Sequence, residues 1–180
     1  MFPVGSYVVY QRQGVCRVEE IGSRFFPRSG QPRQLYYTLS PVFQTGSETI
    51  YVPVDGPVHL RPIMTGEEAA ACLDALDRLE PDLFSTSKVH LLAAHYQELA
   101  SGSLEDLLML LKECTVKQAQ AEDRKRHLGQ VDERYLRLAE RLVYGELAGV
   151  LHTSPQEVRE QVHSRLAGRQ AVPAAALAGA

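Results

Sequence analysis

The hydrophobic pattern of this 180-residue chain changes its period near residue 62. Up to that point, β-branched and aromatic residues fall in short runs that are separated by turn segments with glycine, proline and polar residues. Four such runs cover residues 6–11, 14–22, 34–43 and 48–53, and a candidate fifth covers 58–63. Five short strands within so few residues predict a small β-barrel of the SH3 or Tudor type.

Two pairs of strands can be predicted from this pattern. The stretch Phe2–Glu19 is typical of two strands joined by a turn that ends in Gly14, a residue that tolerates positive φ. Leu35–Leu39 is expected to pair with Glu48–Val52 as a hairpin. Pro53 is expected to end the second of these strands, because its nitrogen has no hydrogen to donate to the ladder.

After residue 64 the apolar residues recur with the period of an α-helix. Helix starts are indicated by hydroxyl residues that can accept hydrogen bonds from the first turn, and Thr65 with Glu68 has the spacing of a capping box. Further helices are predicted over about 88–100 and about 131–151. The residues predicted to cap helices are Thr65, Ser87, Ser103 and Ser154.

The chain is thus predicted to be an α+β protein with two domains. Residues 1–63 form the small SH3/Tudor-like β-barrel, and residues 64–167 form a C-terminal all-α helical bundle. Within the bundle, the polar residues 119–130 are interpreted as a loop or a frayed helix end, and the final helix is expected to end near Leu166. The tail at 168–180 consists of small residues with no partner in view and is predicted to be disordered.

Composition restricts the environment in which we expect the protein. The N-terminus lacks the charged start and the long apolar segment of a signal peptide, and no apolar run is long enough to cross a membrane. The three cysteines, Cys16, Cys72 and Cys114, are far apart in the sequence, which favours buried thiols in a reducing cytosol over disulfides. We therefore expect a cytoplasmic protein that does not contact a membrane, and we expect it to be a monomer.

The sequence contains few motifs that would indicate an enzyme. The six histidines show neither HExxH spacing nor a Cys–His ligand pattern, which argues against a metal site. The chain contains no GxSxG elbow, no GxGxxG loop and no P-loop. We therefore predict no catalytic residues, no metal and no cofactor, and we expect a binding protein rather than an enzyme.

Charge is unevenly divided between the two predicted domains. Residues 1–62 contain six arginines and four acidic residues, whereas the rest of the chain contains 13 basic and 18 acidic residues. The helical part is acidic overall, but it has a basic run at Arg124–His127 and three arginines on one predicted helix face. That face is either solvated, with Glu133 and Glu140 as partners, or a patch that contacts phosphates. Its arginines are Arg134, Arg137 and Arg141.

Several short motifs occur together in the order and spacing of one bacterial family. They are Phe2-x-Val4-Gly5-x-x-Val8-Val9-Tyr10, Gly14-Val15, Tyr36-Tyr37-x-Leu39, Ile50-Tyr51-Val52-Pro53-Val54, Leu60-Arg61, Leu99-Ala100-Ser101-Gly102 and Arg137-Leu138-Ala139-x-x-Leu142-Val143-x-Gly145-Glu146-Leu147-Ala148. The set resembles the CarD/CdnL-type bacterial transcription regulators over roughly residues 1–166. The opening domain of that family also occurs as the polymerase-interacting module of the transcription-repair coupling factor.

The resemblance implies that the barrel docks on the β subunit of RNA polymerase, largely by pairing along a strand edge. By position, it implies polymerase-binding roles for Arg24, Leu39, Tyr51 and Val52. Tyr51 stands where relatives often have arginine, so one charge-assisted contact is missing. The resemblance also implies that the helical domain contacts promoter DNA at the upstream edge of the melted bubble.

The helical domain departs from the family pattern. Relatives carry a tryptophan that wedges into the DNA minor groove, whereas this chain has no tryptophan, and Lys88 stands near the corresponding position. The candidate DNA-binding residues are therefore phosphate-contacting cations, namely Lys88, Arg124, Lys125 and Arg126. The predicted function is a transcription regulator that docks on RNA polymerase, with weak and salt-sensitive contact to promoter DNA. The alternative is a protein-interaction module of the same fold that binds polymerase or another protein without contacting DNA.

Overall fold

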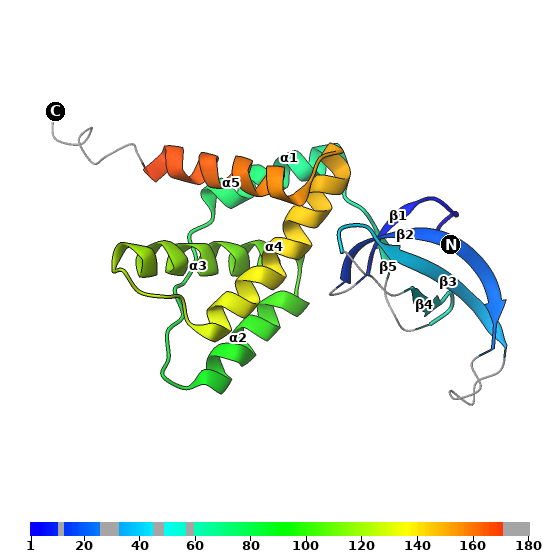
Figure 1. Cartoon of the computed structure of the whole chain (residues 1–180), viewed down its shortest axis with the longest axis horizontal. Coiled ribbons are helices and arrows are strands. Elements are labelled where there is room, and N and C mark those ends of the chain that lie inside the picture. The colour runs from blue at the N-terminus through cyan, green and yellow to red at the C-terminus, as the bar shows by residue number, and fades with distance from the viewer. Residues whose placement is uncertain (11–12, 26–32, 45–48, 57–59, 171–180) are drawn as a thin grey trace. The chain divides into compact units, whose positions relative to one another are not determined.

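The computed structural model describes residues 1–10, 13–25, 33–44, 49–56 and 60–170, with side chains as far as residue 164. The chain divides into two compact units, Met1–Met64 and Thr65–Ala180. The first unit contains the strands and the second contains the helices (Figure 1). The architecture is therefore α+β, as predicted, with the two kinds of secondary structure in separate units.

The N-terminal unit is an antiparallel sheet with the strand order β4-β3-β2-β1-β5. The predicted hairpin is confirmed, because β3 pairs with β4 and Tyr37 lies opposite Val52. Pro53 is the last residue of β4, as predicted. The strands are β1 (Tyr7–Tyr10), β2 (Gly14–Arg24), β3 (Gln34–Pro41), β4 (Ile50–Pro53) and β5 (Leu60–Pro62).

The predicted closed barrel is not observed, because the sheet is open at β4 and β5 in the part of the chain that the structure describes. These two strands contain four and three residues, and each ends in a proline that cannot donate to a ladder. By contrast, β2 and β3 are long and lie side by side in Figure 1. The sheet therefore ends in two short edge strands.

One face of the sheet forms the hydrophobic core of this unit. On β2 the core residues Cys16 and Val18 stand two positions apart, as do Tyr37 and Leu39 on β3, so each pair lies on one face of its strand. A bulge between Val18 and Glu20 shifts the register of this pair once. The core residues are each at most 3% exposed and comprise Val8, Cys16, Val18, Tyr37, Leu39 and Val52.

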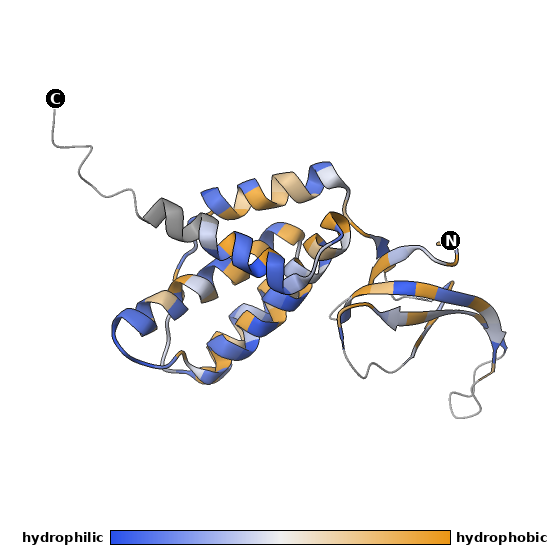
Figure 2. Ribbon diagram, turned by 45° about the horizontal axis from the view of Figure 1, so that its top comes forward, coloured by the Kyte–Doolittle hydropathy of each residue, from blue (hydrophilic) through white to orange (hydrophobic). Residues whose placement is uncertain are grey.

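The C-terminal unit consists of helices that share a second core. Figure 2 shows hydrophobic and hydrophilic residues sharing each helix, as in amphipathic helices packed against one another. On the helix predicted over about 131–151, Leu136, Ala139, Val143 and Leu147 are each at most 5% exposed, and Val150 on the same face is half-buried. The helices are α1 (Gly66–Arg78), α2 (Val89–Ser101), α3 (Leu104–Asp123), α4 (Gln130–Leu151) and α5 (Pro155–Gln170).

Three of the four predicted helix caps are present. Thr65 and Glu68 form the predicted capping box, and Ser103 forms another with Asp106. The Ser154 hydroxyl accepts the backbone N–H of the third residue of α5 at 3.2 Å. Local hydrogen bonds over three residues therefore determine where α1, α3 and α5 begin.

The fourth predicted cap, Ser87, is wrong. α2 begins one residue later, after Lys88, whose side chain makes no capping hydrogen bond. The hydroxyl of Thr86 instead accepts the backbone N–H of Lys88 at 3.1 Å. The first turn of α2 also contains no acidic residue, so α2 begins without the stabilisation found at α1 and α3.

Two helix ends required the structure. Residues 119–130 were interpreted as a loop or a helix end, and α3 continues to Asp123, because glutamine, alanine and glutamate favour helix even without apolar periodicity. α5 continues to Gln170, beyond the predicted end at Leu166 and beyond the predicted domain limit at 167. Residues 171–180 of the predicted tail lie outside the described residues.

The three cysteines are buried free thiols, as predicted. Burial raises the pKa of Cys16 to about 11. Burial also raises the pKa of Cys72 and of Cys114 to about 12 each. The thiols are therefore protonated at neutral pH and behave as small apolar core residues.

Candidate functional site

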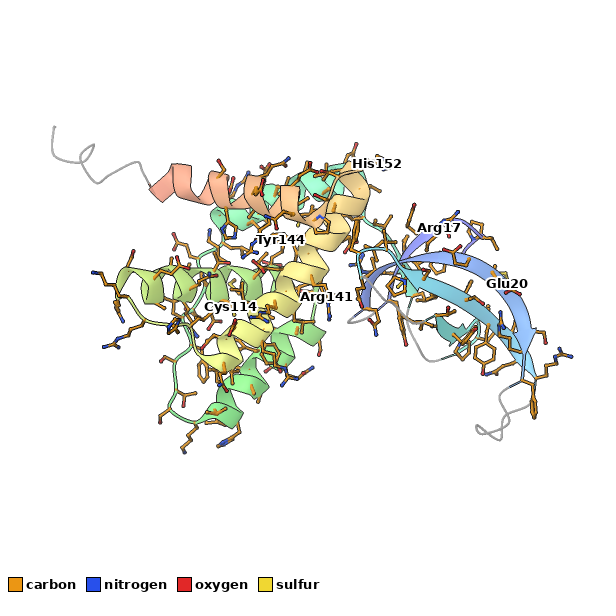
Figure 3. The ribbon with its side chains drawn as sticks, viewed as in Figure 1. Arg17, Glu20, Cys114, Arg141, Tyr144 and His152 are labelled. Atoms are coloured by element: carbon orange, nitrogen blue, oxygen red, sulfur yellow. The ribbon has the colours of Figure 1, made fainter. Side chains whose placement is uncertain are left out.

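A cluster of polar and aromatic side chains spans β2, β3 and β4 on the face of the sheet opposite the core. The register places Glu20 opposite Thr38 and Thr38 opposite Tyr51, so that these residues form a row across three strands. Arg24 reaches into this row from the end of β2. We refer to Glu20, Arg24, Thr38 and Tyr51 as the Arg24 cluster; Figure 3 labels Glu20 on β2.

Arg24 is held by three kinds of contact. Its Nη2 donates to Glu20 Oε2 at 2.7 Å and to the Thr38 hydroxyl at 3.2 Å. Its guanidinium lies over the Tyr51 ring, with the Cζ atom 4.6 Å from the ring centroid. The Arg24 side chain is nevertheless 32% exposed, so the cluster presents a positioned cation at the surface.

The structure therefore brings together two of the four predicted polymerase-binding residues, Arg24 and Tyr51, and separates the other two from the surface. Leu39 and Val52 are 0% and 1% exposed and belong to the core. Leu39 also lies on β3, which is paired on both sides. The polymerase-binding roles of Leu39 and Val52 stay predictions, and the structure shows that their side chains pack in the core of the sheet.

The Arg24 cluster lies next to an edge of the sheet. β4 carries Tyr51 and pairs only with β3 in the described part of the chain. An edge strand presents a row of backbone N–H and C=O groups that another strand can pair with. The geometry thus combines a strand edge with an adjacent cation, which suits an extended partner segment.

The predicted DNA-binding residues belong to two different elements of the helical unit. Lys88 is the N-cap residue of α2 and is exposed. Arg124, Lys125 and Arg126 close the C-terminus of α3 and are also exposed. No hydrogen bond or ion pair joins the two groups among the residues that the structure describes.

The basic residues after α3 have a local structural explanation. Lys125 adopts a left-handed conformation with φ 54°, and the Arg126 backbone N–H donates to the Ala121 carbonyl at 2.8 Å. The Lys125 backbone N–H donates to the Glu122 carbonyl at 2.8 Å, which completes a Schellman motif. Cations at a helix C-terminus interact favourably with the helix dipole, so this basic run stabilises the end of α3 whether or not it binds DNA.

A cleft of about 430 Å³ lies between α3, α4 and α5, and Arg126 is one of its lining residues. The arginines that line it from α4 and α5 are paired. Arg137 forms an ion pair with Glu133, and the Nε atom of Arg159 lies 3.3 Å from Glu140. Burial raises the pKa of Glu140, while Arg159 is foremost among the cations that oppose that rise. Of the two glutamates predicted to pair with the arginines of α4, Glu133 does so, through Arg137. Glu140 pairs with Arg159 of α5 instead.

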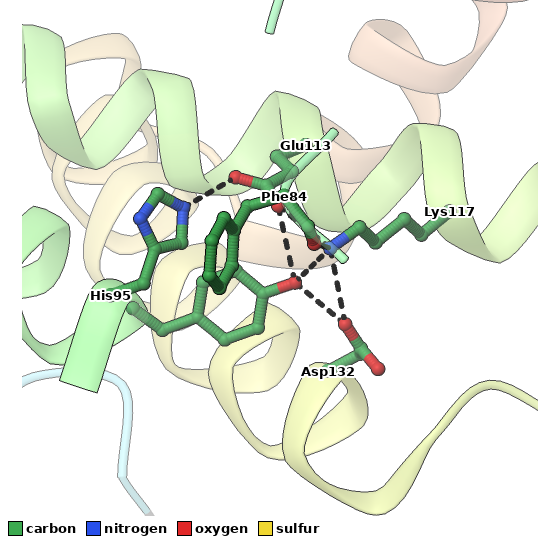
Figure 4. A network of polar contacts seen from close by, with 6 residues as sticks. Phe84, His95, Glu113, Lys117 and Asp132 are labelled. Atoms are coloured by element: carbon green, nitrogen blue, oxygen red, sulfur yellow. Dashed lines mark hydrogen bonds and ion pairs between the residues drawn. The ribbon is translucent and has the colours of Figure 1, made fainter. Parts of the chain in front are cut away.

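A buried polar network joins α2, α3 and α4, and the sequence patterns did not predict it (Figure 4). Lys117 Nζ donates to the Tyr96 hydroxyl and to Glu113 Oε1, both at 2.7 Å. It also donates to the Phe84 carbonyl in the segment before α2. The Tyr96 hydroxyl in turn donates to Asp132 Oδ1 at 2.6 Å.

The network anchors α2, because Tyr96 is the one fully buried residue on that helix. Tyr96 is 0% exposed and Glu113 is 1% exposed. Burial raises the pKa of Tyr96 well above its usual range, and the hydrogen bond to Asp132 raises it further. The phenol therefore stays protonated and donates. Of these contacts, only the i,i+4 spacing of Glu113 and Lys117 leaves a signal in the sequence.

Within the described residues, no group of three or more histidine, cysteine, aspartate and glutamate side chains is placed to hold a metal ion. In the same part of the chain, no helix combines the length and the apolar composition needed to span a membrane.

A family model described as the CarD-like/TRCF RID domain matches residues 2–64. The match extends over all five strands and includes Arg24 and Tyr51. It confirms the family that the motifs of the first predicted domain indicate. No curated protein matches the chain.

Proposed function

Because residues 2–64 form a CarD-like/TRCF RID domain, a type of domain that interacts with RNA polymerase, we propose that this chain is a transcription regulator that docks on the β subunit of RNA polymerase. The observation that carries the proposal is the coincidence of this domain with an edge strand and a positioned cation. Neither catalysis nor a cofactor is required for this role.

The edge of β4 is the proposed docking strand. A partner strand that pairs with β4 gains backbone hydrogen bonds, and side chains next to that edge supply specificity. Arg24 and Tyr51 lie on one face beside the edge, and Tyr51 is 40% exposed. Pro53 ends β4, so the added strand pairs with few residues, and the side-chain contacts must supply much of the affinity.

Reversing the charge of Arg24 is expected to weaken polymerase binding. In the full chain, Arg24→Glu should lower the affinity for the purified β subunit by about tenfold, mainly through slower association, because a rim charge steers the encounter. Biolayer interferometry measures both rate constants. Arg17→Glu is the matched control, since Arg17 lies on the same strand and also pairs with a glutamate, Glu19. Unchanged binding of a folded Arg24→Glu protein would move the contact away from Arg24.

We further propose that the helical domain contacts promoter DNA only when polymerase tethers it nearby. The exposed positions of Lys88 and of Arg124–Arg126 support phosphate contacts, which position a protein without reading sequence. About three such contacts give a slope near −2.7 for log affinity against log salt. Tethering raises the effective concentration and offsets this weak affinity.

Removing three of these cations is expected to abolish the DNA contribution. Alanine at Lys88, Arg124 and Arg126 together should leave binding to polymerase alone unchanged, and should remove the additional affinity that a promoter fork provides. Alanine at Arg134, Arg137 and Arg141 removes the same charge from the α4 face and is the matched control. Tight, salt-insensitive binding of the free protein to a promoter fork would contradict this proposal.

The alternative function is a protein-interaction module that binds polymerase or another protein without DNA. It is supported by the 13 basic and 18 acidic residues of the chain after residue 62, and by the pairing of Arg137 and Arg159 with carboxylates. Equal affinity for polymerase with and without promoter DNA would favour this alternative.

A further inference from the structure

We propose that residues 79–102, which comprise α2 and the segment before it, form an arm that detaches from the helical domain while α1, α3, α4 and α5 stay folded. The Tyr96 hydroxyl sets the equilibrium between the docked and the detached arm, because it bonds to both neighbouring helices. The inference rests on the proposed function in one respect. The arm carries Lys88, so its docking decides whether this candidate DNA contact has a fixed position.

The arm buries little apolar surface, although α2 is rich in leucine and alanine. Within α2, which the structure describes throughout, only Tyr96 is fully buried, whereas α1 buries three residues and α4 buries ten. α2 also begins without a side-chain cap or an acidic first turn. Elements with few buried contacts open at a lower free-energy cost than the core. The large apolar residues exposed on the arm are Leu83, Phe84, Val89 and Leu91, each at least 37% exposed.

Polar contacts around Tyr96 hold the arm on α3 and α4 (Figure 4). The Tyr96 hydroxyl donates to Asp132 Oδ1 at 2.6 Å and accepts from Lys117 Nζ at 2.7 Å. On the next residue of the arm, the Nε2 atom of His95 lies 3.0 Å from Glu113 Oε2. Hydrogen bonds weaken steeply with distance and misalignment, so these contacts are lost together when the arm moves away.

The charges beneath the arm keep their partners when it leaves. Lys117 and Glu113 both lie on α3, with Nζ and Oε1 2.7 Å apart, and Asp132 on α4 lies 3.7 Å from the same ammonium. Detachment therefore hydrates these groups without leaving an unpaired buried charge. α3 and α4 form the most extensive contact between helices, and α1 packs against α3, α4 and α5. The rest of the domain thus has contacts that do not involve the arm.

A buried thiol next to Tyr96 reports whether the arm is docked. Cys114 on α3 is 0% exposed. Burial raises the pKa of its thiol to about 12, and a hydrogen bond with Tyr96 partly opposes that rise, so the two side chains adjoin. A thiol reagent therefore reaches Cys114 once the arm detaches. Cys72 on α1 is a buried free thiol elsewhere in the same domain and serves as the internal reference.

The proposal is tested by alkylating the folded full chain with iodoacetamide at several urea concentrations below the unfolding transition. Peptide mass spectrometry gives the rate at each cysteine. Cys114 should react faster than Cys72, and its rate should depend more weakly on urea, because detaching the arm exposes less surface than unfolding the domain. Equal rates with equal urea dependence would overturn the proposal, since the domain would then open as one unit.

A variant tests the role of the Tyr96 hydroxyl. Tyr96→Phe should raise the alkylation rate of Cys114 by about tenfold to hundredfold, because the lost hydrogen bonds join charged groups. Tyr144→Phe is the matched control, since Tyr144 is also 2% exposed or less, and its hydroxyl has no hydrogen-bond partner among the described residues. An acceleration by Tyr96→Phe no larger than that by Tyr144→Phe would overturn the control by Tyr96.

These rates are measured without polymerase or DNA, so they decide on the arm independently of the proposed function. If a promoter fork adds no affinity to the complex with polymerase, the DNA contact of Lys88 is overturned, and the alkylation of Cys114 alone decides whether the arm detaches.

Discussion

Replacing Lys117 with methionine is expected to destabilise the helical domain by about 3–5 kcal/mol, because it leaves a buried carboxylate without its cation. Glu113 is 1% exposed and its Oε1 lies 2.7 Å from Lys117 Nζ. Asp132, which lies 3.7 Å from the same ammonium, also loses its charge partner. Urea unfolding followed by helical circular dichroism measures the loss, since the helices all lie in this unit.

A rescue variant tests whether the lost charge pair is the cause. Adding Glu113→Gln to Lys117→Met should restore part of the stability, since it removes the buried charge that Lys117 compensates, and the double-mutant cycle should give a coupling of about 0.5–3 kcal/mol. Lys88→Met is the control, because Lys88 is exposed, its side chain makes no capping hydrogen bond, and its loss should change stability by no more than about 0.5 kcal/mol. A loss below about 1 kcal/mol for Lys117→Met would contradict the anchoring role of the network.

Truncating Leu147 to alanine is expected to cost about 2–5 kcal/mol, because the side chain is fully enclosed and its removal leaves a cavity. Leu147 is 0% exposed on α4, on the same helix face as the buried residues Leu136, Ala139 and Val143. The same urea titration measures this change. The large cost follows from close packing, since neighbouring side chains collapse only partly into the space left behind.

The matched control for Leu147 lies one turn further along the same helix. Leu151 is 43% exposed, so Leu151→Ala removes the same atoms without opening an enclosed cavity and should cost well under half as much. A change below about 0.5 kcal/mol for Leu147→Ala would contradict the assignment of this face of α4 to the core.

Local patterns predicted most of the secondary structure. The runs Leu35–Leu39 and Glu48–Val52 predicted the β3–β4 hairpin, and Pro53 predicted its end. Hydroxyl residues at 65, 103 and 154 predicted three helix starts. These signals depend on residues that are close together in the chain, so they can be recognised in the amino-acid sequence. The end of α3 was left open between a loop and a helix end, because its last residues have helix propensity without apolar periodicity.

The candidate site was predicted only in part. Position in a family motif indicated Arg24 and Tyr51, but it did not indicate that they stack on each other or that Glu20 pairs with Arg24. It also assigned contact roles to Leu39 and Val52, whose side chains the sheet buries. Which face of a strand is buried depends on what packs against it, and a motif alone does not contain that information.

The sequence by itself determined the two-part α+β organisation, the family of the N-terminal domain and most of the helix and strand limits. Only the tertiary structure decided that the sheet is open at β4, that Arg24 is held by Thr38 and Tyr51, and that Lys117 lies between Glu113, Tyr96 and Asp132. The hydrogen bond from Tyr96 to Asp132 spans 36 residues and the one from Arg24 to Thr38 spans 14. Such contacts depend on the packing of separate elements, and their energies come from burial, which no local period or spacing records.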